Sequence, residues 1–261
     1  MTHTVLGPAA GSRCIVVGGC GGIGRAYVHG LIAGGCRVAV IDLATSLNAA
    51  PPPADVAGIG ADASDPAALE SAFASAVSQL GGLDVMAHVA GINPRQARVS
   101  EIEVADYERV LAVNLRSAVL SAKFALPAMQ SSGGSMVFVS SGLALNPEPT
   151  FGSYSISKAG LIALAKTVAK ENAPAIRANV VAPGVVDTAF LSGGTGSGGE
   201  KGKAGYFDEL GDLKTRILAS IPMGRMAEAE DVAGPMLFLT GPASAYMTGQ
   251  VLYINGGRLM P

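Results

Sequence analysis

The sequence predicts an α/β protein: a single domain in which a doubly wound parallel sheet lies between two layers of helices, in a three-layer α/β/α arrangement. Two observations lead to this prediction. Short apolar runs of strand length alternate with longer stretches of helical periodicity along all 261 residues, as expected for a parallel sheet whose crossovers are helices. No internal repeat and no change in composition marks a boundary between domains.

The composition indicates a globular protein with a large core. Apolar residues make up 49% of the chain and charged residues 15%, which is not the composition of a disordered segment. The net charge is -2 and there is no basic run, so neither nucleic acid nor an anionic membrane surface is an expected partner. Residues 1–11 lack a signal-peptide pattern, and Arg116 and Lys123 interrupt the longest apolar helical stretch, so no membrane span is expected.

The cysteines and histidines do not form a metal-binding pattern. Cys14, Cys20 and Cys36 include no CxxC pair, and the histidines His3, His29 and His88 are scattered. The expectation is therefore reduced thiols, no metal site and a cytoplasmic location.

Residues 13–42 predict a dinucleotide-binding unit. An apolar strand at 13–17 is followed by a glycine-rich loop, a helical pattern at 25–33 and a second apolar strand at 36–41, with Asp42 at its end. Glycines let the backbone turn tightly and approach a pyrophosphate, whose negative charge is stabilised at the N-terminus of the helix. The carboxylate of Asp42 is placed to bind ribose hydroxyls and to repel a 2′-phosphate.

The glycines of this loop fit two registers. Gly19-x-Gly21-x-x-Gly24 matches the common dinucleotide fingerprint, and Gly18-x-x-x-Gly22-x-Gly24 matches a wider spacing. The sequence alone does not choose between them, and a glycine-rich turn that binds no ligand is the alternative to both.

The remaining predicted elements continue the alternation. Strands are expected at 56–61, 83–89, 135–139, 176–181 and 250–254, and helices at 64–80, 104–129, 152–170, 206–220 and 229–239. Ser64 is the expected N-cap of its helix, and His88 is expected to be a packed residue. Ligands of such sheets bind beyond the carboxyl ends of the strands. Residues that should meet along this edge are Gly18, Asp42, Asp62, Gly91, Ser141 and Pro183.

Tyr154 and Lys158 form the candidate catalytic pair. Four residues apart on a helix, they lie one turn from each other, and an ammonium beside a phenol favours the phenolate. The pair would then serve as an acid–base near neutral pH, with Ser141 close by; an ordinary contact on a helix surface is the alternative. Asn114 lies within a long helical stretch, where it is either locally hydrogen-bonded or marks a break that aims a backbone carbonyl.

Residues 192–205 are rich in glycine and serine and are not expected to form a regular element. A loop of this length within a compact domain is usually functional or disordered. Two readings stay open for residues 192–205, a lid and an exposed flexible insert, within a wider region at about 187–225 that is expected to form a flexible substrate loop or lid.

In order and spacing, these motifs resemble the short-chain dehydrogenase/reductase family over essentially the whole chain, which implies that family's Rossmann-like fold. The residues that match the family's tyrosine, lysine, serine, helix asparagine, wider glycine register and Pro-Gly are Tyr154, Lys158, Ser141, Asn114, Gly18, Gly22, Gly24, Pro183 and Gly184. The chain also departs from the family. Val17 stands where a threonine is usual, and His88-Val89-Ala90-Gly91 replaces Asn-Asn-Ala-Gly, which leaves open how the fourth strand is tied to its neighbours.

The resemblance implies an oxidoreductase that transfers a hydride between a nicotinamide cofactor and a secondary alcohol or ketone. Tyr154 would exchange a proton with the substrate oxygen, and Ser141 would hydrogen-bond that oxygen. Lys158 would also bind the nicotinamide ribose, and Asn114 would help to hold a water. Lys158 and the positive nicotinamide are expected to lower the pKa of Tyr154 from ~10 by roughly two or three units.

The expected cofactor is NAD(H), because Gly21 and Leu43 occupy positions where related proteins that bind NADP often have a basic residue, and because Asp42 adds repulsion. The residues expected to contact it are Gly18, Cys20, Gly21, Gly22, Ile23, Gly24, Asp42, Leu43, Asp62, Ala63, Ala90, Gly91, Val113, Tyr154, Lys158, Pro183, Gly184, Val186 and Thr188. Those expected to contact the substrate are Ser141, Leu143, Tyr154, Phe190 and Leu191.

Other functions stay open on the sequence. A 3-oxoacyl thioester is the rival substrate within the same class of enzyme. A protein that senses NAD without catalysis would be expected to lose Tyr154, Lys158 or Ser141, and all three are present. A sugar-nucleotide epimerase or dehydratase normally needs a larger substrate domain. The resemblance also implies a homotetramer or dimer that binds a small-molecule substrate.

Overall fold

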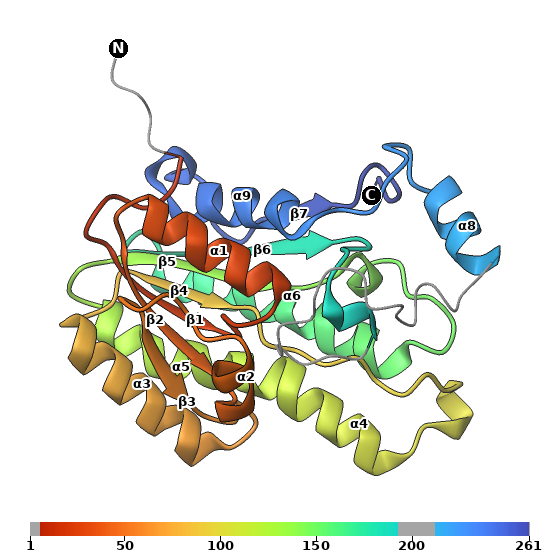
Figure 1. Ribbon diagram of the computed structural model, residues 1–261, viewed down its shortest axis with the longest axis horizontal. Helices are drawn as coiled ribbons and strands as arrows, with labels where there is room; N and C mark the ends of the chain where they lie inside the picture. The colour runs from red at the N-terminus through yellow and green to blue at the C-terminus, as the bar shows by residue number, and fades with distance from the viewer. Residues whose placement is uncertain (1–5, 193–211, 261) are drawn as a thin grey trace.

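A single parallel sheet of seven strands organises the protein. The computed structural model describes residues 6–192 and 212–260, and within them the strand order is β3-β2-β1-β4-β5-β6-β7 (Figure 1). The strands are β1 (Arg13–Val17), β2 (Arg37–Asp42), β3 (Ala57–Gly60), β4 (Val85–His88), β5 (Gly134–Val139), β6 (Ile176–Pro183) and β7 (Val251–Ile254). Every pairing between neighbours is parallel. The predicted doubly wound, Rossmann-like sheet is confirmed.

Helices cover both faces of this sheet, which makes the three predicted layers (Figure 1). One face packs against α3 (Pro66–Leu80), α5 (Ser117–Met129) and α6 (Gly152–Asn172); the other packs against α1 (Gly22–Ala33) and α9 (Ala229–Thr240). Alternate residues of each strand point to opposite faces, so Ile15 belongs to the first core and Cys14 to the second. Both faces are buried, which explains why the strands are apolar runs without a polar side.

The chain reverses its direction of travel across the sheet at β1. It moves outward from β1 to β3, then crosses back to place β4 on the other side of β1. Crevices at such a switch point, beyond the carboxyl ends of the strands, are where ligands bind in this architecture. The registers align these ends, since Val17 pairs with both Ile41 and His88.

Several element boundaries differ from the prediction. The helix α1 begins at Gly22 rather than at residue 25, and a short helix, α2 (Ala44–Ala49), was not expected. The N-cap of α3 is Asp65 rather than Ser64: the carboxylate of Asp65 accepts from the backbone amides of Ala67 and Ala68. The hydroxyl of Ser64 donates instead to Asp62 Oδ1, at 2.7 Å.

The predicted long helix at 104–129 consists of three parts. These are α4 (Val104–Leu111), a π-helical turn (Ala112–Arg116) and α5. Their combined length and apolar composition would suffice to cross a membrane despite Arg116 and Lys123. The buried residues of α5 nevertheless pack into the core on one face of the sheet, so this is a core helix of the domain.

The region after β6 is described only in part. A 3-10 turn (Ala189–Ser192) precedes residues 193–211, and α8 (Asp212–Ala219) follows them. The predicted glycine-rich lid therefore lies, apart from its first residue, outside the described residues, as does the beginning of the helix predicted at 206–220.

Candidate active site

Tyr154 and Lys158 lie in the first turns of α6 and are buried, with 8% and 3% of their surfaces exposed. The alternative of a helix-surface contact is therefore wrong. The ammonium of Lys158 lies 5.6 Å from the centre of the Tyr154 ring and donates to the carbonyl of Val139 at 2.9 Å. Ser140, at the end of β5, donates its hydroxyl to the carbonyl of Lys158 at 2.7 Å. The end of β5 thus holds both the side chain and the backbone of the lysine.

Ser141 reaches Tyr154 from the loop after β5. It caps a 3-10 turn (Gly142–Ala144), where its hydroxyl oxygen accepts from the amide of Leu143 at 3.2 Å. A hydrogen bond between Ser141 and Tyr154 opposes the effect of burial on the pKa of the tyrosine. The structure brings Ser141, Tyr154 and Lys158 together, as the sequence predicts.

Burial dominates the electrostatics of this cluster. It raises the pKa of Tyr154 to about 12, although the hydrogen bond from Ser141 acts in the opposite direction. Burial also lowers the pKa of Lys158 to about 8, because the charged ammonium loses its hydration. The expected lowering of the tyrosine pKa by its lysine neighbour is therefore not found in the chain by itself. Desolvation of the buried phenol, which spacing along the helix does not reveal, raises the pKa instead.

His88 is a packed residue, as predicted. Its ring is fully buried at the end of β4, and its two nitrogens lie 3.2 Å and 3.1 Å from the hydroxyls of Ser121 and Ser117 on α5. Burial, together with the charge of Lys158, lowers its pKa to about 3. The backbone amides of Val89 and Ala90 donate to the carbonyl of Val17. The fourth strand is thus tied to its neighbours without the asparagines that the family usually has there.

Asn114 lies in the π-helical turn, which confirms a local break in the helix. Its carboxamide is fully buried: Oδ1 accepts from the amide of Ile92 at 2.8 Å, and Nδ2 donates to the carbonyl of Ile92 at 3.0 Å. Nδ2 also lies 3.2 Å from the hydroxyl of Ser157 on α6. The asparagine therefore fixes the loop after β4 against the helix that carries Tyr154.

Close packing at the glycine-rich loop supports the wider register. A Cβ on Gly18, whose φ is +85°, would lie 2.5 Å from the backbone nitrogen of Ala90. A Cβ on Gly22 would lie 2.5 Å from Cγ2 of Thr188, and one on Gly24 would overlap the carbonyl oxygen of Gly18. Only glycine can pack this closely at the three positions, against the β4 loop, Thr188 and the loop itself. A tight glycine turn that leads into a helix N-terminus is compatible with a bound pyrophosphate.

Asp42 ties the end of β2 to this loop. Its two carboxylate oxygens accept from the amides of Cys20, at 2.9 Å, and Leu43, at 2.8 Å. Burial and the charge of Asp42 raise the pKa of the Cys20 thiol to about 12, so this cysteine is a neutral packing residue. A carboxylate offers about four acceptor positions, so Asp42 retains capacity for ribose hydroxyls while it holds the loop.

The other predicted cofactor residues follow strand ends at the same edge. Gly91 lies beside Asn114 and Lys158, because a Cβ at its position would lie 3.3 Å from Asn114 Oδ1 and from Lys158 Nζ. Val113 is part of the π-helical turn. The remaining residues form two groups. Those that follow β3 or β4, or lie at or after the end of β6, are Asp62, Ala63, Ala90, Pro183, Gly184 and Val186. Those in the glycine-rich loop and the first turn of α1 are Cys20, Gly21 and Ile23.

Phe190 packs closest to the tyrosine on the predicted substrate side. Its ring centre lies 6.3 Å from that of Tyr154, and Leu191 follows it in the same 3-10 turn. Leu143 lies in the turn that Ser141 caps. Sequence reasoning missed Asn93, which donates to the carbonyl of Phe190 at 2.6 Å. No local pattern could have found it, because the two residues belong to different loops.

A glycine-rich loop at the switch point of a parallel sheet is where dinucleotides bind in this architecture, and the buried Tyr154, Lys158 and Ser141 lie at the same edge. Residues 18–258 match the family model described as Enoyl-(Acyl carrier protein) reductase. The chain is 35% identical to an uncharacterized short-chain type dehydrogenase/reductase of Sinorhizobium fredii, over 92% of this chain and 93% of that one. It is 31% identical to the 3-oxoacyl-[acyl-carrier-protein] reductase FabG of Escherichia coli, over 96% and 98%.

Among solved structures, a short-chain dehydrogenase/reductase of Brucella melitensis that is named glucose/ribitol dehydrogenase superposes with a TM-score of 0.86 at 27% identity. The match covers 98% of this chain and 99% of that one. The chain belongs to the short-chain dehydrogenase/reductase family. It is therefore an oxidoreductase, and a nicotinamide dinucleotide is the cofactor typical of its family.

Proposed function

We propose that this protein is an NAD-dependent oxidoreductase that interconverts a secondary alcohol and a ketone, with Tyr154 as the general acid–base. The observation that carries the proposal is the buried cluster of Tyr154, Lys158 and Ser141 at the carboxyl edge of the sheet. A buried, hydrogen-bonded phenol next to an ammonium suits proton transfer, and strongly shifted pKa values such as theirs are concentrated at functional sites.

In the reductive direction the neutral phenol of Tyr154 donates its proton to the developing alkoxide. A pKa of about 12 keeps this group protonated at neutral pH, and Ser141 hydrogen-bonds the same substrate oxygen. In the oxidative direction Tyr154 accepts the hydroxyl proton. The bound cofactor supplies the hydride acceptor or donor, and its oxidised nicotinamide adds the positive charge that lowers the pKa of the phenol. By resemblance to the family, Lys158 would hold the nicotinamide ribose, and Asn114 would help to hold a water on the proton path.

Asp42 supports NAD rather than NADP. Its carboxylate stands at the end of β2, fixed by two backbone amides, where it would repel a 2′-phosphate. Arg25, the first cation after the glycine-rich loop, is engaged with the carbonyls of Ala50 and Pro51 at 3.2 and 3.4 Å. Neither Gly21 nor Leu43 offers a positive charge for the phosphate.

A panel of secondary alcohols and ketones tests the proposal, with NADH and NADPH compared at equal concentration by their absorbance. Turnover of at least one pair with a clear preference for NADH is the expected result. Equal efficiency with both cofactors would contradict the cofactor assignment, and cofactor binding without turnover of any substrate would instead favour a protein that senses NAD.

A 3-oxoacyl thioester reductase is the second candidate, because the FabG of Escherichia coli is 31% identical over nearly the whole chain. Acetoacetyl-coenzyme A as substrate separates the two. If it is reduced much faster than simple ketones, the thioester assignment replaces the first one.

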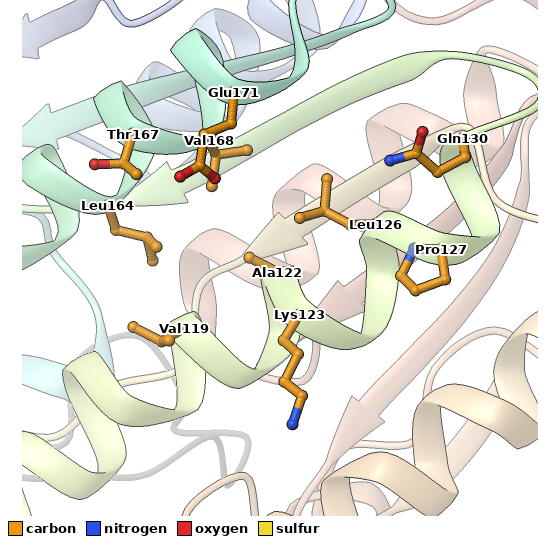
Figure 2. A pocket seen from close by; sticks show the side chains of 10 residues that line it. All are labelled: Val119, Ala122, Lys123, Leu126, Pro127, Gln130, Leu164, Thr167, Val168 and Glu171. Carbon is orange, nitrogen blue, oxygen red and sulfur yellow. The ribbon is translucent and has the colours of Figure 1, made fainter.

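The apolar groove in Figure 2 supports a homodimer or homotetramer. It has a volume of about 510 Å³ and lies between α5 and α6, lined by apolar residues such as Val119, Leu126 and Leu164. Its lining also includes one charge of each sign, Lys123 on α5 and Glu171 on α6, as a self-complementary interface between two copies would use. A sedimentation peak at the mass of a monomer, 26.1 kDa, would overturn this assembly.

A further inference from the structure

Two loops from different strand ends meet at Tyr154. The loop after β4 contributes Asn93, whose carboxamide nitrogen donates to the backbone carbonyl of Phe190 at 2.6 Å. Phe190 lies in the 3-10 turn after β6, and its ring is tilted by 49° against the ring of Tyr154 at 6.3 Å. One side-chain hydrogen bond therefore joins the two loops next to the aromatic ring that packs against Tyr154.

The loop that carries Asn93 is itself anchored next to the active site. Both backbone groups of Ile92, the preceding residue, are bound by the side chain of Asn114. Asn114 is fully buried and also contacts Ser157. Because Ile92 is fixed in both directions, Asn93 starts from a rigid point, and its amide can hold the carbonyl of Phe190 at a defined distance from α6.

The segment that carries Phe190 is packed at its other end against the glycine-rich loop. The side chain of Thr188 lies within 2.5 Å of the position that a Cβ of Gly22 would take, and the amide of Leu191 donates to the carbonyl of Thr188 at 3.1 Å. The turn thus bridges the predicted cofactor cradle and Tyr154, with Asn93 as its tie to the β4 loop.

We propose that Asn93 is a positioning residue for substrate selection: by holding Phe190 against Tyr154, it forms the apolar wall along which the carbon chain of a ketone or alcohol lies. This inference rests on the proposed function and adds a substrate class to it, namely ketones whose carbon chain is long enough to reach the ring of Phe190. A small ketone would occupy only the space at Ser141 and Tyr154 and would gain nothing from the wall.

The hydrogen bond between Asn93 and the carbonyl of Phe190 is called the clasp below. Its removal should raise the KM for long substrates more than it changes kcat. In Asn93→Ala, the KM for a ketone such as 2-octanone should rise about tenfold relative to 2-butanone, the loss expected when one hydrogen bond no longer orders the wall. The kcat and the NADH affinity, followed by the cofactor's own fluorescence, should change less than twofold. Asn93→Gln retains the donor and should recover part of the loss.

The Phe190→Ala background distinguishes a clasp from an ordinary structural tie. If Asn93 acts through the aromatic ring, Asn93→Ala should have less than a twofold further effect on the 2-octanone to 2-butanone ratio once the ring is gone. Gln250→Ala is the matched control, because the exposed side-chain amide of Gln250 also donates to a backbone carbonyl, that of Thr248. An equal rise in KM for all ketones, or an undiminished effect in the Phe190→Ala background, would overturn the proposal.

Amide hydrogen exchange tests the clasp without any assay of activity. Residues 188–192 should exchange at least about fivefold faster in Asn93→Ala than in the wild type or in Gln250→Ala. Unchanged exchange would refute the clasp. If the wild type turns over no alcohol or ketone, the proposed function fails, while faster exchange would still establish that Asn93 holds this turn.

Discussion

The proposed cofactor side and the proposed substrate side of the site are built differently. The cofactor side consists of β1, the glycine-rich loop, the start of α1 and the end of β2, which are consecutive in the chain. Its geometry depends on glycines that approach other backbone and on one carboxylate that accepts from two amides. The substrate side is made by Ser141, Tyr154, Phe190 and Asn93, which come from four separate segments.

Local backbone constraints can therefore be predicted from sequence, whereas contacts between loops that are distant in the chain cannot. A glycine needed for a tight approach appears as a glycine in the sequence. A side-chain hydrogen bond between residues 93 and 190 leaves no pattern in either loop. Substitutions on the two sides should therefore differ in whether they change kcat, cofactor affinity or the free energy of unfolding.

Tyr154→Phe should abolish most of the activity while it leaves the cofactor side intact. The variant keeps the ring and removes the acid, so kcat should fall about a thousandfold, within the usual range for general acid–base catalysis. NADH fluorescence should show binding within about threefold of wild type. Tyr246→Phe, at a fully exposed tyrosine, is the control. Turnover near the wild-type rate would remove the tyrosine from the mechanism.

Lys158→Met should reveal the free-energy cost of burying the Lys158 ammonium, which lies between the two sides. Burial lowers the pKa of Lys158 from 10.5 to about 8, so between these pH values the unfolded chain binds more protons than the folded one. The free energy of unfolding of the wild type should then rise with pH across this window, by up to about 3 kcal/mol relative to Lys158→Met. Denaturant unfolding at several pH values measures it.

Lys166→Met is the matched control for this measurement, because Lys166 lies on the same helix and is exposed. The same pH dependence relative to both variants would contradict a buried ammonium at Lys158. The two sides would then differ in backbone and side-chain geometry but not in the burial of a charge.

Gly18→Ala should damage the cofactor side through the backbone. Alanine at a φ of +85° costs about 1–2 kcal/mol, and its Cβ would clash with the backbone of Ala90. The free energy of unfolding should fall by more than about 2 kcal/mol, and NADH affinity should fall with it. Gly234→Ala lies in α9 with nothing within 4 Å of its Cβ position, so it should be neutral or stabilising by up to about 1 kcal/mol.

Asp42→Asn should relax cofactor choice with the smallest effect on the fold. The carboxamide oxygen can still accept from the amide of Cys20, but the acceptor of the Leu43 amide becomes an NH2 group and the negative charge is lost. The ratio of kcat/KM with NADH to that with NADPH should fall about tenfold, while the free energy of unfolding falls by about 1 kcal/mol. Glu70→Gln removes a charge from the exposed face of α3 and is the control. An unchanged ratio would separate Asp42 from cofactor selection.

Much of the fold was predictable because its signals are local. Apolar runs located every strand of the sheet, and the acid after β2 and the serine after β5 were placed at the correct edge. The N-cap of α3 was predicted wrongly, because Ser64 and Asp65 both suit that position. Asp65 is the N-cap, since the hydroxyl of Ser64 donates to Asp62. The break at Asn114 was one of two open readings, and the π-helical turn decided it.

By itself, the sequence determined the order of elements, the glycine-rich loop with its acid, and the spacing of Tyr154 and Lys158. These depend on residues near one another in the chain, whose steric and hydrogen-bonding demands act locally. Only the tertiary structure decided how deeply Tyr154 and Lys158 are buried, and hence the direction in which their pKa values move. It alone brought Asn93 to Phe190, because burial and contacts between loops are properties of the packed whole.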